Sequence, residues 1–331
     1  MNGLSTLKNY EKNMLGSWTL SINNGSSCWE NPDNVQKINR LFLSLFEELS
    51  KKLPALIVLR AIVVTPDVIQ EYDRLLEETE RKARVDLPRA GLVIGKVLTW
   101  GSCENLENYF ALIVINEGVC ISSVFEDDSE SKCMIAHELA HIAEGYVTRN
   151  VKGNEKEDIY QHEWEKIRFS KAANVYSEFF AQIIAYPYYT NKNILQKHIN
   201  YAIALLDSAT VFLNHEITKY RKSADMGRLW PISVSELSRV FDQIGRSIGL
   251  LVCIDYEENE SSWNTFIEQV KEVNPSWVAV IEEFRSALLA IDKIEQDSFN
   301  PLCEAINHGF IAAGLAPEIL EDGVLYIHVP E

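Results

Sequence analysis

Two histidines and a glutamate in one short stretch carry the clearest chemical signal in this 331-residue chain: His137, Glu138 and His141. Their spacing is His-Glu-x-x-His, and the surrounding run, residues 133–145, has the pattern of a helix. Residues four apart on a helix lie on one face, so the two histidines can offer imidazole nitrogens to one metal ion. Glu138 is then placed to act as a general base on water. The stretch therefore predicts a zinc site.

A third ligand has to come from another part of the chain, because catalytic zinc sites normally have three protein ligands and keep the fourth position for water. Glu178 ranks first, since Ala181 and Ala185 follow it on the same face of a predicted helix. Small side chains on that face let the two helices approach closely enough for the carboxylate to reach the ion. His162 and Glu163 rank second, because their neighbours combine bulk with mixed charge.

Apolar periodicity predicts the elements that must position these residues. The predicted helices cover residues 33–52, 65–84, 159–185, 194–222, 233–251, 262–273 and 276–297. The predicted strands cover residues 55–64, 91–100, 109–116 and 323–329.

Capping and helix-breaking residues suggest several boundaries. Thr65 is the expected N-cap of the second helix, with Pro66 at its first position. The acidic run 126–130 favours the start of the His-Glu-x-x-His helix, and Gly145 is its expected end. A break near Ser170 would divide the glutamate helix.

Together these elements predict an α+β fold. Residues 1–190 are expected to form a zincin-like domain, in which a small mixed β-sheet accompanies the His-Glu-x-x-His helix and the glutamate helix. Residues 191–331 are expected to form a mainly helical domain for substrate or partner recognition, or for regulation. Apolar stripes in that half are interpreted as core, with an interaction surface as the alternative.

The chain resembles the ImmA/IrrE group of bacterial zinc peptidases in two segments, Ala136-His137-Glu138-Leu139-Ala140-His141 and Glu178-x-x-Ala181-Gln182-x-x-Ala185. The resemblance covers roughly residues 90–187. It implies a gluzincin-type fold with His137, His141 and Glu178 as Zn²⁺ ligands and Glu138 as the base. Some members of the group cleave repressors or transcription regulators, which implies a protein substrate of that kind.

Two further parts of such a site have candidates in the sequence. The strand at residues 109–116 precedes the motif helix, and it is expected to present an edge on which an extended substrate pairs. A donor for the tetrahedral oxyanion is also needed. The sequence offers Tyr186, Tyr188, Tyr189 and His162 without grounds to choose among them.

Other residues near the motif have both a functional and a structural interpretation. Cys133 could touch the ion or act as a redox-sensitive inhibitor, but a small buried hydrophobic residue is the favoured interpretation. Glu144 could hydrogen-bond a ligand, or it could be a solvated acid. The run 186–189 could line a substrate cleft, although a packing corner between helices is favoured.

Composition excludes several functional classes. With 31 basic and 48 acidic residues the net charge is −17, which disfavours direct binding to nucleic acid and to acidic membranes. Six scattered cysteines without a Cys-x-x-Cys pair fit reduced thiols, so a cytoplasmic protein is expected. We expect neither a signal peptide nor a membrane span.

The sequence thus predicts a zinc-dependent endopeptidase that hydrolyses a peptide bond in a protein substrate. The alternative is a binding or regulatory module that keeps the zincin fold without turnover, against which the presence of Glu138 argues. A third possibility is that no metal binds. The substrate, its cleavage site, the activation mechanism and the oligomeric state are not determined by the sequence.

Overall fold

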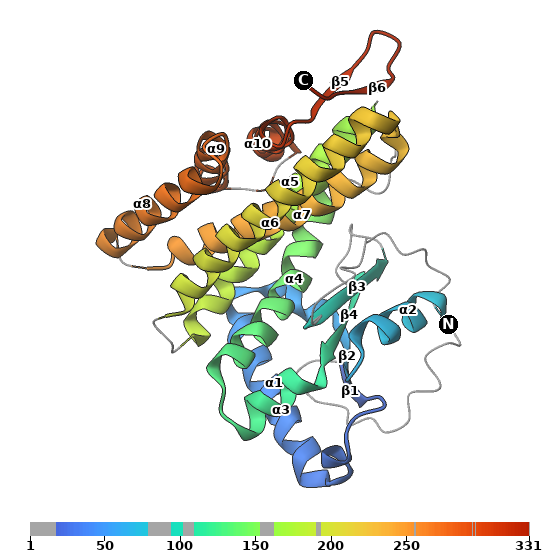
Figure 1. Cartoon of the computed structure of the whole chain (residues 1–331). Helices are drawn as coiled ribbons and strands as arrows, with labels where there is room; N and C mark the ends of the chain where they lie inside the picture. The colour runs from blue at the N-terminus through green and yellow to red at the C-terminus, as the bar shows by residue number, and fades with distance from the viewer. Residues whose placement is uncertain are drawn as a thin grey trace. The chain divides into compact units, whose positions relative to one another are not determined.

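A computed structural model of the chain describes residues 18–78, 94–101, 109–152, 162–189, 193–254, 256–292, 294 and 296–330 (Figure 1). The chain divides into two compact units. One comprises Met1–Asn150 and Ile184–Asn191, and the other comprises Val151–Ile183 and Lys192–Glu331. The described part has the predicted α+β fold, with one mixed four-stranded sheet and a mostly helical remainder.

The sheet belongs to the first unit. Its strands are β1 (Thr19–Ile22), β2 (Leu59–Thr65), β3 (Gly95–Gly101) and β4 (Tyr109–Asn116), in the order β1-β2-β4-β3. β1, β2 and β4 are parallel, whereas β3 is antiparallel to β4, so the predicted mixed sheet is confirmed. β4 pairs with β2 on one side and with β3 on the other, and its residues 111–115 are almost fully buried. The prediction that β4 offers a free edge is therefore wrong.

The predicted strand at residues 55–64 begins later than expected. A 3₁₀ helix occupies Pro54–Val58, and β2 starts at Leu59. Proline fixes its own φ and lacks an N–H group, which suits the first turn of a helix better than a strand. Most of the aliphatic run is buried as predicted, but Ile57 is 59% exposed, and only the second half of the run pairs with other strands.

The helices beside the sheet follow the apolar pattern with shifted starts. α1 (Pro32–Lys52) buries the predicted stripe and confirms the first helix. α2 (Val68–Glu78) begins after Asp67, whose Oδ1 accepts a hydrogen bond from the backbone N–H of Gln70 at 2.9 Å. Thr65 instead ends β2, so the expected cap is wrong by two residues. The end predicted for this helix lies outside the described residues.

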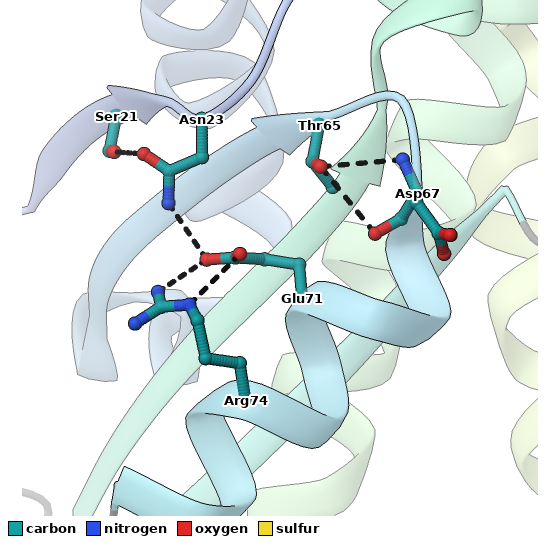
Figure 2. A network of polar contacts seen from close by, with 6 residues as sticks. All are labelled: Ser21, Asn23, Thr65, Asp67, Glu71 and Arg74. Carbon is teal, nitrogen blue, oxygen red and sulfur yellow. Dashed lines mark hydrogen bonds and ion pairs between the residues drawn. The ribbon is translucent and has the colours of Figure 1, made fainter.

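A buried carboxylate joins β1 to α2 (Figure 2). Glu71 is only 4% exposed and accepts hydrogen bonds from Asn23 Nδ2 at 2.7 Å and from Arg74 Nε at 3.0 Å. Asn23 in turn accepts a bond from the Ser21 hydroxyl at 2.7 Å. A buried charge needs such partners, and this network links the carboxyl end of β1 to α2.

Two helices follow β4 directly. α3 (Glu117–Phe125) was not predicted, and Asn116 caps it by accepting a hydrogen bond from Gly118 N at 2.9 Å. α4 (Ser129–Lys152) carries the His-Glu-x-x-His motif, and Asp128 caps it through the backbone N–H of Ser131 at 2.9 Å. The acidic run therefore lies at the start of this helix as predicted.

The second unit is mainly helical. It contains α5 (Glu163–Ala185), α6 (Ile194–Ser223), α7 (Met226–Leu251), α8 (Tyr256–Val273), α9 (Trp277–Leu289) and α10 (Asn300–Ala312). The last two residues of α5 belong to the first unit. A hairpin of β5 (Ala316–Ile319) and β6 (Leu325–His328) follows α10. The predicted helices are present, but α7 and α8 begin before the predicted starts at residues 233 and 262, and α9 ends before residue 297. α10 and β5 were not predicted. α5 has no break at Ser170.

Most of the predicted apolar stripe of α6 is core, although Ile203 is partly exposed. Its buried residues include Ile194, Leu195, Ile199, Ala202 and Leu206, each at most 8% exposed. Along the described stretches, no helix is both long and apolar enough to cross a membrane.

Candidate metal centre

The motif histidines lie one turn apart on α4. The helix buries Ala136, Leu139 and Ala140, and this burial fixes its orientation in the first unit. His137 is 7% exposed, and its Nε2 lies 3.1 Å from His141 Nε2. The two rings stand at 87° with centroids 4.7 Å apart. Both Nε2 atoms therefore converge on one point beside the helix.

α4 continues past the expected stop at Gly145 and ends at Lys152. Glycine is tolerated inside a helix at a cost of about 1 kcal/mol relative to alanine. The longer helix does not alter the spacing of His137 and His141, which depends only on the turn between them.

Glu178 belongs to α5, in the second unit. Its side chain is 16% exposed, and its Oε2 accepts a hydrogen bond from Arg246 Nε of α7 at 2.6 Å. The predicted small residues are fully buried, since Ala181 and Ala185 are each 0% exposed.

His137, His141 and Glu178 form a group that could hold a metal ion. One ligand atom from each residue, an imidazole nitrogen or a carboxylate oxygen, lies within 4.8 Å of the others. Within the part of the chain that the structure describes, this group includes neither His162 nor Glu163. The structure therefore brings together the three residues ranked first as ligands, while their roles as ligands stay a prediction.

The separation of the two histidine nitrogens fits two ligands of one tetrahedral zinc ion. Zn–N distances of about 2.0–2.1 Å place two nitrogen ligands about 3.3 Å apart. The observed separation of 3.1 Å between the histidine nitrogens is close to that value. Two imidazoles and one carboxylate also leave the fourth position for water, as catalytic zinc sites require.

Glu138 follows His137 on α4 and lies against the start of β3. A Cβ atom added at Gly95 would be 2.7 Å from Glu138 Cγ and 2.9 Å from Cδ. Any larger residue at Gly95 would therefore displace the Glu138 side chain. This contact could not be predicted from the sequence, because β3 and α4 are far apart along the chain.

Cys133 and Glu144 are both buried, at 1% and 6% exposed. Burial raises the pKa of the Cys133 thiol, and a hydrogen bond with Tyr189 partly offsets this effect. The structure thus favours the interpretation of Cys133 as a buried residue, and the interpretation of Glu144 as a solvated acid is wrong.

The four candidate oxyanion donors occupy different surroundings. Tyr186–Tyr188 form a 3₁₀ helix that leads to Tyr189. Burial and the neighbouring Glu48 carboxylate raise the pKa of Tyr188, so its hydroxyl keeps its proton. His162 lies beside the hairpin turn, where a Cβ at Gly323 would be 3.4 Å from its Cε1. The assignment of an oxyanion donor stays open among these residues.

Sequence reasoning missed Arg246, which lies 68 positions from Glu178. A weak signal was present, because Gly245 and Gly249 flank it with the spacing that permits close contact between helices.

Comparisons of the chain with protein-family models, with curated proteins and with solved structures found no match. The candidate site therefore rests on the sequence motif and on the geometry of the three residues.

Proposed function

We propose that this chain is a zinc-dependent endopeptidase that hydrolyses a peptide bond in a protein substrate. The observation that carries the proposal is the convergence of His137, His141 and Glu178, whose ligand atoms lie within 4.8 Å of one another. The His-Glu-x-x-His spacing adds a fourth residue, because it places a carboxylate next to the first histidine.

Each residue has a defined part in this proposal. His137, His141 and Glu178 hold the ion, which when bound acts as a Lewis acid and lowers the pKa of coordinated water to about 7. Glu138 takes a proton from the attacking water and later delivers it to the leaving amine nitrogen. Since Glu138 is not a ligand, its loss should remove turnover and leave metal binding intact.

The proposed substrate is a protein, and a transcription regulator is the class that the resemblance suggests. An extended substrate would need a strand with an unpaired side. β3 is an edge strand of the sheet as the structure describes it, and its Gly95 lies against Glu138. Both features favour β3 over β4 for this role.

The test combines metal analysis with a search for cleavage products. We expect the purified protein to bind one zinc per chain and to generate new N-termini in a library of proteome-derived peptides, detected by mass spectrometry. Glu138→Gln should keep the zinc and lose the cleavage. His137→Ala should lose both.

Glu130→Gln is a matched control, since Glu130 is also on α4 but lies in its first turn. It should cleave like the unaltered protein. A protein without bound zinc would overturn the proposal, and so would equal cleavage by the Glu138→Gln variant.

A further inference from the structure

α5 and α7 cross at very short distance, within the second unit. A Cβ added at Gly245 would be 2.5 Å from the backbone oxygen of Val175, and one added at Gly249 would be 2.6 Å from that of Phe179. Two glycines four residues apart therefore form one face of α7 that contacts the backbone of α5. The crossing fixes α7 against the turn of α5 that carries Glu178.

Arg246 lies between these two glycines in the sequence. Its Nε donates to Glu178 Oε2 at 2.6 Å, and the side chains of Arg246 and Glu178 are 36% and 16% exposed. A short charge-assisted bond of this kind restricts the rotation of the carboxylate. A carboxylate offers two oxygens and about four lone-pair sites, so a carboxylate that accepts one such bond can also bind an ion.

We propose that Arg246 is a positioning residue that holds the Glu178 carboxylate ready to bind the metal. This inference rests on the proposed function, because it requires Glu178 to be a metal ligand. Carboxylates that bind metals are commonly hydrogen-bonded by a further residue, and loss of such a partner typically weakens metal binding. The helical half of the chain thereby contributes directly to the metal site through α7.

A purely structural role for Arg246 makes a different prediction, and a double-mutant cycle separates the two. If Arg246 acts through Glu178, its substitution should matter only while Glu178 is present. If it only stabilises the helical unit, its substitution should change zinc binding equally with and without Glu178.

The experiment uses the full chain and measures zinc affinity by competition with a chromophoric chelator. We expect Arg246→Ala to weaken zinc binding by about 10- to 100-fold. Arg246→Lys should recover only part of that loss, because lysine is a point charge without the planar guanidinium fork. In a Glu178→Ala background, Arg246→Ala should change the affinity by less than about twofold.

Arg239→Ala is the matched control. Arg239 is also on α7 but pairs with Glu236 at 3.1 Å on the exposed side. It should bind zinc within about twofold of the unaltered protein. The visible spectrum of the cobalt-substituted protein provides a second measurement, and it should change in Arg246→Ala but not in Arg239→Ala.

The outcomes are distinguishable. If the unaltered protein binds no zinc, both the proposed function and this inference fail. If it binds zinc and Arg246→Ala binds equally well, only the positioning role fails. An equal loss with and without Glu178 also overturns the positioning role. If Arg246→Ala does not fold, as judged by circular dichroism, the same cycle with Arg246→Lys decides in the same way.

Discussion

Substitution of Gly245 by alanine tests the crossing of α5 and α7 directly. The added Cβ would lie 2.5 Å from the Val175 backbone oxygen, whereas ordinary contact begins at 3.4 Å, so the helices must separate by about 0.9 Å. The obstructing atom is backbone and cannot rotate away. Overpacking of this kind costs about 1–3 kcal/mol. Alanine offsets part of that cost by up to about 1 kcal/mol through its higher helix propensity.

Gly227→Ala supplies the comparison. Gly227 is on the same helix, and a Cβ there would meet nothing closer than Asp225 Oδ1 at 3.5 Å. Both substitutions gain helix propensity, so the difference between the two variants isolates most of the steric cost. We expect Gly245→Ala to be less stable than Gly227→Ala by about 1–3 kcal/mol.

The assay is urea unfolding followed by far-ultraviolet circular dichroism, with the free energy of unfolding taken from the midpoint and slope. Zinc affinity of the folded variants is measured alongside, because separation of the helices also draws Arg246 away from Glu178. If Gly245→Ala unfolds at the same urea concentration as Gly227→Ala or a higher one, the close crossing is refuted.

Three further changes test other parts of the structure. Gly95→Ala should displace the Glu138 side chain and lower peptide cleavage about 10-fold or more, with zinc affinity unchanged. Glu71→Ala should lower the free energy of unfolding by about 1.5–3 kcal/mol, because it removes the charged acceptor of a buried network. Burial raises the pKa of Cys303 from 9.0 to about 11, so iodoacetamide should modify it at pH 8 about 100-fold more slowly than an unperturbed thiol, as measured by mass spectrometry.

Each of these changes has a control and a contrary result. If Gly95→Ala loses zinc, the contact between Gly95 and Glu138 supports the metal ligands and not the base. Glu236→Ala breaks an exposed ion pair and should lower the free energy of unfolding by no more than about 0.5 kcal/mol. If Glu71→Ala lowers it by the same small amount, the argument from burial is contradicted. Cys303 should react faster as the pH rises toward 11, and at the rate of an ordinary thiol in urea. Fast modification in the folded protein at pH 8 would refute its shielding.

The site was predictable where its determinants are local. The spacing of His137 and His141 fixes their relation on any helix, and small residues after Glu178 mark a helix face suited to close contact. The contact of Arg246 with Glu178 was not predicted, because the glycines beside Arg246 mark a face suited to close contact but do not say which helix crosses it.

The same distinction applies to the fold. Apolar periodicity identified most helices and strands, since it reflects burial of one face. The place of β4 inside the sheet depends on pairing with β2 and β3, which local sequence does not encode. Gly145 was misread as a helix end because a glycine's effect depends on the packing around it.

The glycine crossing also bears on how the chain can be divided. A fragment that stops at residue 190 would carry the complete His-Glu-x-x-His motif and Glu178, yet it would expose the face of α5 that Gly245 and Gly249 cover. A sequence search that looks only for the metal ligands would treat such a fragment as a complete domain. For this chain the smallest piece worth expressing extends at least through Leu251, the end of α7.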